Sequence, residues 1–256
     1  MVMSYFTVEF YSDVLGGDGE FAVFLPKNTK PPYKVLWLLH GAFAENHEAI
    51  LYSSVCLYAE KRGMAIVAPT SYLGVYTDMV YGEKGYSFVE EVVEKAPKLF
   101  TCLSKERNDN FIMGISMGGH GSFKLAMNHP DRFYGACGFS SPVDMVYTMS
   151  ILEAGRHGGG HELYDAFGSS AAYRDSVGDV VGLAKKHLIE QTPLPRLSLC
   201  WGDNEHAGPE DERLKQIFDE IGVKMFTKIG HGGHYYDTWD PMMEESLDYI
   251  MEGADK

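Results

Sequence analysis

The segment Gly114-Ile115-Ser116-Met117-Gly118 fits the pattern G-x-S-x-G. In this pattern the serine stands at a sharp turn from a strand into a helix, where glycines clear the crowded backbone. The residues before it, 111–113, are apolar and strand-like, and a helical pattern follows Gly119. The N-terminus of that helix favours negative charge that develops at the serine. We therefore predict Ser116 to be a nucleophile for acyl transfer.

A serine nucleophile needs a histidine base, and in this arrangement the chain order is serine, acid, histidine. Two histidines, His231 and His234, follow the last predicted strand. We prefer His234 because the aromatic residues Tyr235, Tyr236 and Trp239 follow it and could form the wall of an apolar site. His231 is the alternative base.

The acid is expected in the loop after the predicted strand 197–201, where it would fix the tautomer of the imidazole. That loop offers both Asp203 and Glu205. The pattern of residues alone leaves both carboxylates open.

Two backbone N–H groups must stabilise the oxyanion that forms when an ester carbonyl is attacked. Met117, the residue after the serine, should provide one of them. The other should come from the loop after the strand 35–39, where Gly41 lets the backbone turn. Ala42 is the expected second donor, and Phe43 is the alternative.

These residues must be positioned by an alternation of strands and helices. Hydrophobic patterning predicts strands at residues 8–11, 21–25, 35–39, 65–68, 111–115, 133–139, 197–201 and 223–229. Helices are predicted at residues 48–62, 86–103 with a kink or break at Pro97, 119–128, 211–221 and 237–251. Such alternation is typical of an α/β fold with a mostly parallel central sheet, helices on both faces and here an antiparallel edge.

The connection between Pro142 and Pro195 is too long for a plain loop. We expect a single domain over residues 1–256, with a cap-like insertion at about 143–194 that partly covers the site.

Composition limits the classes of partner. The formal net charge of −14 repels nucleic acid and anionic membrane surfaces. The four cysteines, in no CxxC spacing, favour reduced thiols, and neither a signal peptide nor a run of about 20 apolar residues is recognisable. We expect a cytoplasmic protein without cofactor. No metal is expected either, because the histidine pair His157 and His161 stands in a glycine-rich segment that offers no rigid site.

Several stretches together resemble the tributyrin esterase and esterase D-like family of α/β-hydrolases, which is related to feruloyl esterases and mycolyltransferases. They are Leu38-Leu39-His40-Gly41 with Asn46-His47, Tyr76-Thr77-Asp78 with Tyr81-Gly82, the serine turn continued through His120-Gly121, and Gly233-His234 with Trp239. The resemblance runs from about Val35 to the C-terminus.

By this resemblance Ser116 is the nucleophile, His234 the base and Glu205 the acid, although the family usually has aspartate at the acid position. Tryptophans usual in the family are replaced by Val75 and Ile50, which we expect to alter the substrate pocket. Substrate contacts are expected from Phe43, Tyr76, Tyr81, His120, Tyr235 and Trp239.

The resemblance implies a serine carboxylesterase that hydrolyses short-chain acyl esters, with acetyl or feruloyl esters of plant carbohydrates as candidates. Alternatives are an acyltransferase with the same triad, an S-formylglutathione hydrolase-like thioesterase and a binding protein without activity. The thioesterase ranks low because His40-Gly41-Ala42-Phe43-Ala44 stands where those enzymes usually carry Ser-Gly-Leu-Thr-Cys. The expected partner is a small-molecule ester, and a homo-oligomer is an open alternative.

Overall fold

A computed structural model describes residues 4–71, 73–154, 165–206 and 208–255 of the chain. Its centre is an eight-stranded sheet in the order β1-β2-β4-β3-β5-β6-β7-β8. The strands are β1 (Ser4–Ser12), β2 (Gly17–Leu25), β3 (Lys34–Leu39), β4 (Met64–Pro69), β5 (Asn110–Ile115), β6 (Gly135–Phe139), β7 (Arg196–Gly202) and β8 (Met225–Gly230). β2 is antiparallel to both β1 and β4, and the other neighbours are parallel. The predicted mostly parallel sheet with an antiparallel edge is confirmed.

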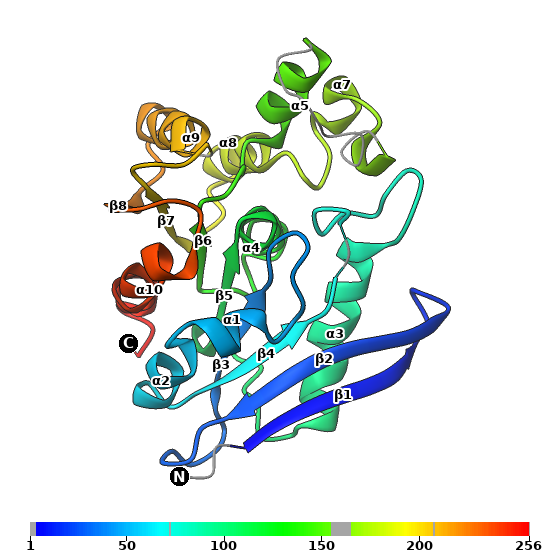
Figure 1. Cartoon of the computed structure of the whole chain (residues 1–256), viewed down its shortest axis with the longest axis vertical. Coiled ribbons are helices and arrows are strands. Elements are labelled where there is room, and N and C mark those ends of the chain that lie inside the picture. The colour runs from blue at the N-terminus through cyan, green and yellow to red at the C-terminus, as the bar shows by residue number, and fades with distance from the viewer. Residues whose placement is uncertain (1–3, 72, 155–164, 207, 256) are drawn as a thin grey trace.

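Helices cover both faces of this sheet, as Figure 1 shows. They are α1 (Glu48–Tyr52), α2 (Val55–Lys61), α3 (Gly85–Leu99), α4 (Met117–Asn128), α5 (Met145–Glu153), α7 (Ser170–Tyr173), α8 (Val180–Glu190), α9 (Gly208–Ile221) and α10 (Tyr236–Met251). α1, α2 and α10 contribute to the apolar core on one face, and α3, α4, α8 and α9 contribute to the core on the other.

The alternation of side chains along the buried strands creates these two cores. In β3, Val35 and Trp37 join the core of α3 and α4, whereas Leu36 and Leu38 join the core of α2 and α10. All four side chains are almost fully buried. A strand covered on both faces must be apolar at every position, which explains the continuous apolar run in the sequence.

The segment predicted as one helix over residues 48–62 forms two helices, α1 and α2. Ser53 adopts an extended backbone, and its hydroxyl donates to the carbonyl oxygen of Ala49 at 2.6 Å. The backbone N–H of Ser54 donates to Asp240 at 2.6 Å instead of continuing the helix. The break therefore depends on a partner far away in the sequence.

Pro97 does not divide α3, which ends at Leu99 and not at residue 103. A proline within a helix lacks the N–H that would bond to the carbonyl four residues earlier. That carbonyl belongs to Val93, and it accepts a hydrogen bond from the Arg132 side chain at 2.7 Å. The polar group freed by the proline is thus satisfied, and the last turn of the helix persists.

The long connection predicted at 143–194 has two parts. α5 and α7 lie together apart from the strands, at the top of Figure 1. α8 packs against α4, with Val180 and Ala184 buried in the same core as Phe123, and α5 and α7 add Met149 and Tyr173 to that core. The two histidines considered as metal ligands, His157 and His161, fall outside the described residues.

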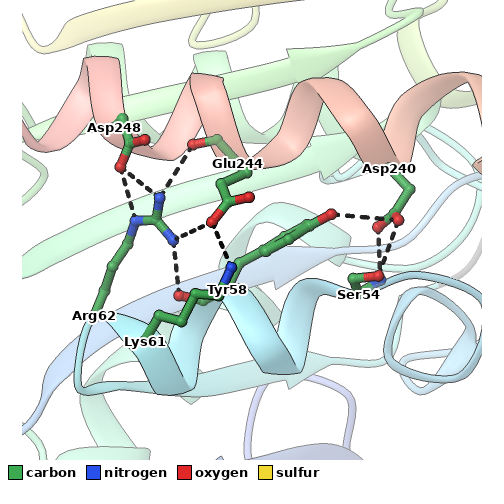
Figure 2. Close-up of polar contacts among 7 residues, drawn as sticks. All are labelled: Ser54, Tyr58, Lys61, Arg62, Asp240, Glu244 and Asp248. Atoms are coloured by element: carbon green, nitrogen blue, oxygen red, sulfur yellow. Dashed lines mark hydrogen bonds and ion pairs between the residues drawn. The ribbon is translucent and has the colours of Figure 1, made fainter.

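A polar seam joins α2 to α10 (Figure 2). Asp240 accepts hydrogen bonds from the backbone N–H and hydroxyl of Ser54 at 2.6 and 2.9 Å and faces the Tyr58 hydroxyl at 3.4 Å. Arg62 forms an ion pair with Asp248 through Nη2. Its Nη1 donates a hydrogen bond to the carbonyl oxygen of Tyr58 at 3.0 Å. Because Asp240 lies in the first turns of α10, the seam fixes the beginning of the helix that follows the predicted base.

We predict that Asp240→Ala lowers the free energy of unfolding by about 2 kcal/mol, since it leaves a backbone N–H and a hydroxyl without their charged acceptor. Lys61→Ala is the matched control at the same seam. Lys61 forms an exposed ion pair with Glu244, so its loss should cost below about 0.5 kcal/mol. Urea denaturation of both variants measures the difference, and equal losses would contradict the importance of Asp240.

Candidate active site

Ser116 stands at the turn between β5 and α4 in a strained backbone conformation, with φ of 54° and ψ of −118°. Non-glycine residues rarely adopt such a positive φ, and strain of this kind is typical of a functional turn. The turn is possible only because its neighbours are small. A Cβ at Gly114 would lie 1.9 Å from the carbonyl oxygen of Gly118, and one at Gly118 would lie 2.2 Å from that of Leu39.

His234 and Glu205 form a hydrogen-bonded pair, with 2.8 Å between His234 Nδ1 and Glu205 Oε2. The other carboxylate oxygen, Oε1, accepts hydrogen bonds from the Ser140 hydroxyl at 2.6 Å and from the backbone N–H of Gly202 at 2.5 Å. With Nδ1 donating its proton to the carboxylate, Nε2 is left as the basic nitrogen. His234 and Ser116 line the same cavity, of about 260 Å³.

The Glu205 side chain is only 1% exposed, so its charge depends on these donors. Burial by itself raises the pKa of Glu205, but the hydrogen bonds from His234, Ser140 and Gly202 outweigh it and hold the pKa below the usual range. The carboxylate therefore stays charged and can stabilise an imidazolium.

Ser140 is a residue of the candidate site that the sequence pattern did not predict. Its hydroxyl donates to Glu205 and accepts a hydrogen bond from the indole N–H of Trp239 at 2.6 Å. The Trp239 ring also lies edge-on to the His234 ring, with 4.8 Å between centroids and an angle of 86°. A polar residue directly after β6, the strand beside β5, was the available signal.

The alternative acid and base are Asp203 and His231. They bond to each other and not to His234 or Glu205. Asp203 Oδ2 lies 2.9 Å from His231 Nδ1, and Oδ1 accepts from the Gly232 N–H at 2.9 Å. The His231 side chain is 98% exposed, and neither residue lines the cavity of Ser116. We therefore do not retain this pair as part of the candidate triad.

The expected oxyanion loop packs directly against the nucleophile. A Cβ added to Gly41 would lie 3.5 Å from the Cβ of Ser116, so the loop backbone approaches the serine closely. Ala42 lines the cavity, and Met117 is the first residue of α4, where backbone N–H groups have no partner within the helix. Phe43, the alternative donor and a predicted substrate contact, has an 88% exposed side chain that lines a neighbouring cavity.

His40 holds this loop from behind. Its Nε2 accepts the backbone N–H of Ser71 at 2.9 Å, so its Nδ1 carries the proton and donates to the carbonyl of Gly41 at 2.8 Å. The Tyr76 hydroxyl donates to the carbonyl of His40 at 3.0 Å. Burial lowers the pKa of His40, which keeps the imidazole neutral in the fold.

Of the predicted substrate contacts, Tyr235 and Trp239 line the cavity. Tyr81 is 76% exposed, and its backbone N–H bonds to Asp165 beside the helices α5 and α7, not at the cavity. Tyr76 and His120 were also predicted to contact the substrate. The structure disagrees, because both side chains are fully buried and neither lines the cavity.

His120 supports the fold behind the site. Its Nδ1 lies 3.2 Å from the carbonyl of Val143, and its Nε2 lies 2.7 Å from the Tyr173 hydroxyl in α7. One turn later the buried Lys124 donates to the carbonyl of Val75 at 3.0 Å and to the Thr77 hydroxyl at 2.6 Å. Val75, expected to shape the pocket, is therefore part of a buried loop that α4 anchors.

Asp211 is a buried carboxyl group beside the candidate acid. Its Oδ1 accepts the backbone N–H of Ser141 at 3.2 Å, and its Oδ2 has no hydrogen-bond partner among the described residues. Burial raises the pKa of Asp211, and the charge of Glu205 raises it further. Both effects disfavour a second negative charge beside Glu205.

No group of three or more histidine, cysteine, aspartate or glutamate side chains suited to a metal ion occurs in the described part of the chain. Within the same ranges, no helix is long and apolar enough to cross a bilayer.

We predict that the free energy of unfolding decreases between about pH 7 and about pH 5, partly because of His40. Its folded pKa lies below the unfolded value of 6.5, so the unfolded chain binds more protons as the pH falls. His40→Gln, whose amide oxygen can still accept from Ser71, should reduce this slope, with the remainder contributed by other groups such as His120.

His231→Gln is a control that should change the pH dependence of the free energy of unfolding in the opposite direction. The hydrogen bond with Asp203 raises the pKa of His231, so its small contribution is present below pH 6.5 and lost above it. Its removal should make the loss at acid pH slightly steeper. Urea denaturation at three pH values measures the slopes, and an unchanged slope in His40→Gln would refute the neutral buried state.

Comparison of the chain with known proteins identifies relatives that are esterases. The chain matches the model of the Esterase family, described as "Putative esterase", over residues 12–247. An acetyl esterase of Caldicellulosiruptor saccharolyticus is 22% identical over 268 residues, which cover 99% of this chain and 100% of that protein.

Two solved structures from Staphylococcus aureus are similar over nearly their full length. The fluorophosphonate-binding serine hydrolase FphF has a TM-score of 0.87 and 25% identity, covering 98% of this chain and 99% of that chain. The S-formylglutathione hydrolase FrmB has a TM-score of 0.84 and 25% identity, covering 98% and 100%. The predicted α/β-hydrolase resemblance is confirmed, and the chain belongs to the Esterase family as a carboxylic-ester hydrolase.

Proposed function

We propose that the protein hydrolyses short-chain acyl esters through an acyl-enzyme on Ser116, with His234 as base and Glu205 as acid. The observation that carries this proposal is the 2.8 Å contact between the buried Glu205 carboxylate and His234, which lines the same cavity as Ser116. A serine, an imidazole and a buried carboxylate in this order supply a nucleophile, a proton carrier and its counter-charge.

The reaction follows from these roles. His234 Nε2 takes the proton of the Ser116 hydroxyl as its oxygen attacks the ester carbonyl. The N–H groups of Met117 and Ala42 stabilise the tetrahedral oxyanion. The C–O bond to the alcohol then breaks, and His234 gives its proton to the departing oxygen. A water molecule, deprotonated by His234, attacks the acyl-enzyme and releases the acid and Ser116.

The cavity supports a small acyl group. Its volume of about 260 Å³ lies just below the range of roughly 300–1,000 Å³ that is usual for sites of drug-sized ligands. Ala42 and Ala44 form part of the wall, and Tyr235, which is 70% exposed, stands at its open side. The name of the acetyl esterase relative supports an acetyl group, with a feruloyl group on a plant carbohydrate as the larger candidate.

A second candidate activity is thioester hydrolysis of the S-formylglutathione type. It is favoured by the similarity to FrmB, which is named an S-formylglutathione hydrolase. We further propose that the protein is cytoplasmic, which the free thiols of all four cysteines support, and that α5 and α7 form the partial cap.

We predict that wild-type protein hydrolyses p-nitrophenyl esters with highest kcat/KM at acyl chains of two to about four carbons, because longer chains exceed the cavity. Ser116→Ala should lower kcat by at least about 10⁴-fold. A fluorophosphonate probe should label the wild type and not the variant. Hydrolysis that persists in Ser116→Ala would refute the proposed nucleophile.

Replacing each carboxylate separately tests the acid. Glu205→Gln should lower kcat by about 10³- to 10⁴-fold, because its amide N–H₂ would favour the wrong tautomer of His234. Asp203→Asn should change kcat by less than about threefold, since Asp203 bonds only to the exposed His231 loop. The reverse ranking of the two variants would assign the acid to Asp203.

A further inference from the structure

The cavity of Ser116 has one acidic side chain on its wall that the proposed mechanism does not use. Glu48, the first residue of α1, lines the cavity together with Tyr236, the first residue of α10. The position lies two residues before Ile50, in the stretch after Asn46-His47. A carboxylate on this wall adds negative charge to the space that an ester bound at Ser116 would enter.

Tyr236 lies with this carboxylate on the cavity wall. Burial, followed by the nearby charge of Glu48, raises the pKa of Tyr236. The Tyr236 ring is itself fixed, packing edge-on to Trp239 with 5.3 Å between centroids and against Tyr52 at 6.0 Å. The raised pKa keeps the Tyr236 phenol uncharged, so the phenol does not offset the charge of Glu48.

No positive side chain opposes this charge at the cavity. Among the described residues that line it, none is lysine or arginine, and the one histidine is the base. A neighbouring cavity of about 600 Å³, which shares Ala44 with it, also has acidic residues and neither lysine nor arginine among its described lining residues, and the acidic ones are Glu9, Asp18, Glu20 and Glu45. With a net charge of −14 for the chain, a substrate approaches the serine through a negative potential.

We propose that Glu48 is a specificity-determining residue that selects esters with a cationic or hydrogen-bond-donating group beside the ester and rejects esters with an anionic group there. This inference rests on the proposed function. It makes S-formylglutathione, whose two carboxylates and one ammonium leave a net negative charge, a poor substrate for this member of the family. The favoured class therefore comprises acyl esters of amino alcohols or of polyhydroxylated alcohols.

The experiment compares three acetyl thioesters that differ in the charge of the leaving thiol: acetylthiocholine, S-acetyl-mercaptoethanol and S-acetyl-thioglycolate. The released thiol is measured in the same way for all three. The wild type should prefer the cation over the anion in kcat/KM. In Glu48→Gln, which keeps the side-chain size, the cation-to-anion ratio should fall by about tenfold. High salt should reduce the cation-to-anion ratio of the wild type only weakly, because salt screens a charge on a cavity wall less than an exposed surface charge.

Glu220→Gln, in the exposed last turn of α9, is the matched control, because it removes one negative charge far from the cavity. Its ratio should remain within about twofold of the wild type. An equal ratio in the wild type, Glu48→Gln and Glu220→Gln would overturn the assignment of Glu48. In that case the proposed function still stands if p-nitrophenyl acetate hydrolysis depends on Ser116. If no ester is hydrolysed by the wild type, the proposed function and this inference both fail.

Discussion

The buried carboxylate of Glu205 is the interaction on which the candidate site depends. A charge that is 1% exposed is costly unless hydrogen-bond donors replace the water it has lost. The three donors come from three separate segments: the end of β7, the residue after β6 and the loop before α10. Satisfying one carboxylate therefore fixes the relative positions of these segments, and with them the imidazole beside the nucleophile.

This requirement extends well beyond the cavity. Ser140 can donate to Glu205 in its observed orientation while its oxygen accepts from Trp239, which belongs to α10. The start of α10 is in turn held by Asp240, which accepts hydrogen bonds from Ser54 at the N-terminus of α2. The polar seam in Figure 2 is thus part of the mechanical support of the base, although none of its residues lines the cavity of Ser116.

The sequence predicted what depends on local pattern. Buried strands are continuous apolar runs, and the serine turn needs glycines at fixed positions, so the sheet, Ser116 and the region of the base could be found without a structure. The residue pattern left the choice between Asp203 and Glu205 open, because the two carboxylates lie in one loop, and only the family resemblance favoured Glu205. The backbone N–H groups of Asp203 and Asn204 bond to the carbonyls of Gly230 and Gly232, which continues the pairing of β7 with β8. That pairing directs Asp203 outward to His231 and leaves Glu205 to turn inward.

The predictions that the structure contradicts also failed because of contacts between distant segments. Tyr76 and His120 were expected at the substrate because they stand beside recognisable motifs, but their side chains are buried, where their polar atoms bond to His40, Val143 and Tyr173. The break between α1 and α2 depends on Asp240, 186 residues from Ser54. Contacts between segments distant in sequence decided each of these outcomes, and hydrophobic periodicity carries no information about them.

The electrostatics of the cavity explain why its backbone geometry is so constrained. The protein is acidic, and the cavity of Ser116 has no lysine or arginine among its described lining residues, yet the reaction must stabilise an oxyanion. The pairing of Glu205 with His234 limits the opposing charge, and in the proposed mechanism the favourable interaction comes from N–H dipoles at the start of α4 and in the loop after β3. Dipoles act only at short range and in a fixed direction, whereas a mobile ammonium group could adjust its position. The strained Ser116, the contact of Gly41 with it and the tethering of Gly41 by His40 are therefore consequences of one arrangement. In the proposed mechanism these N–H groups stabilise negative charge at one point of the cavity, whereas Glu48 opposes negative charge at another part of its wall.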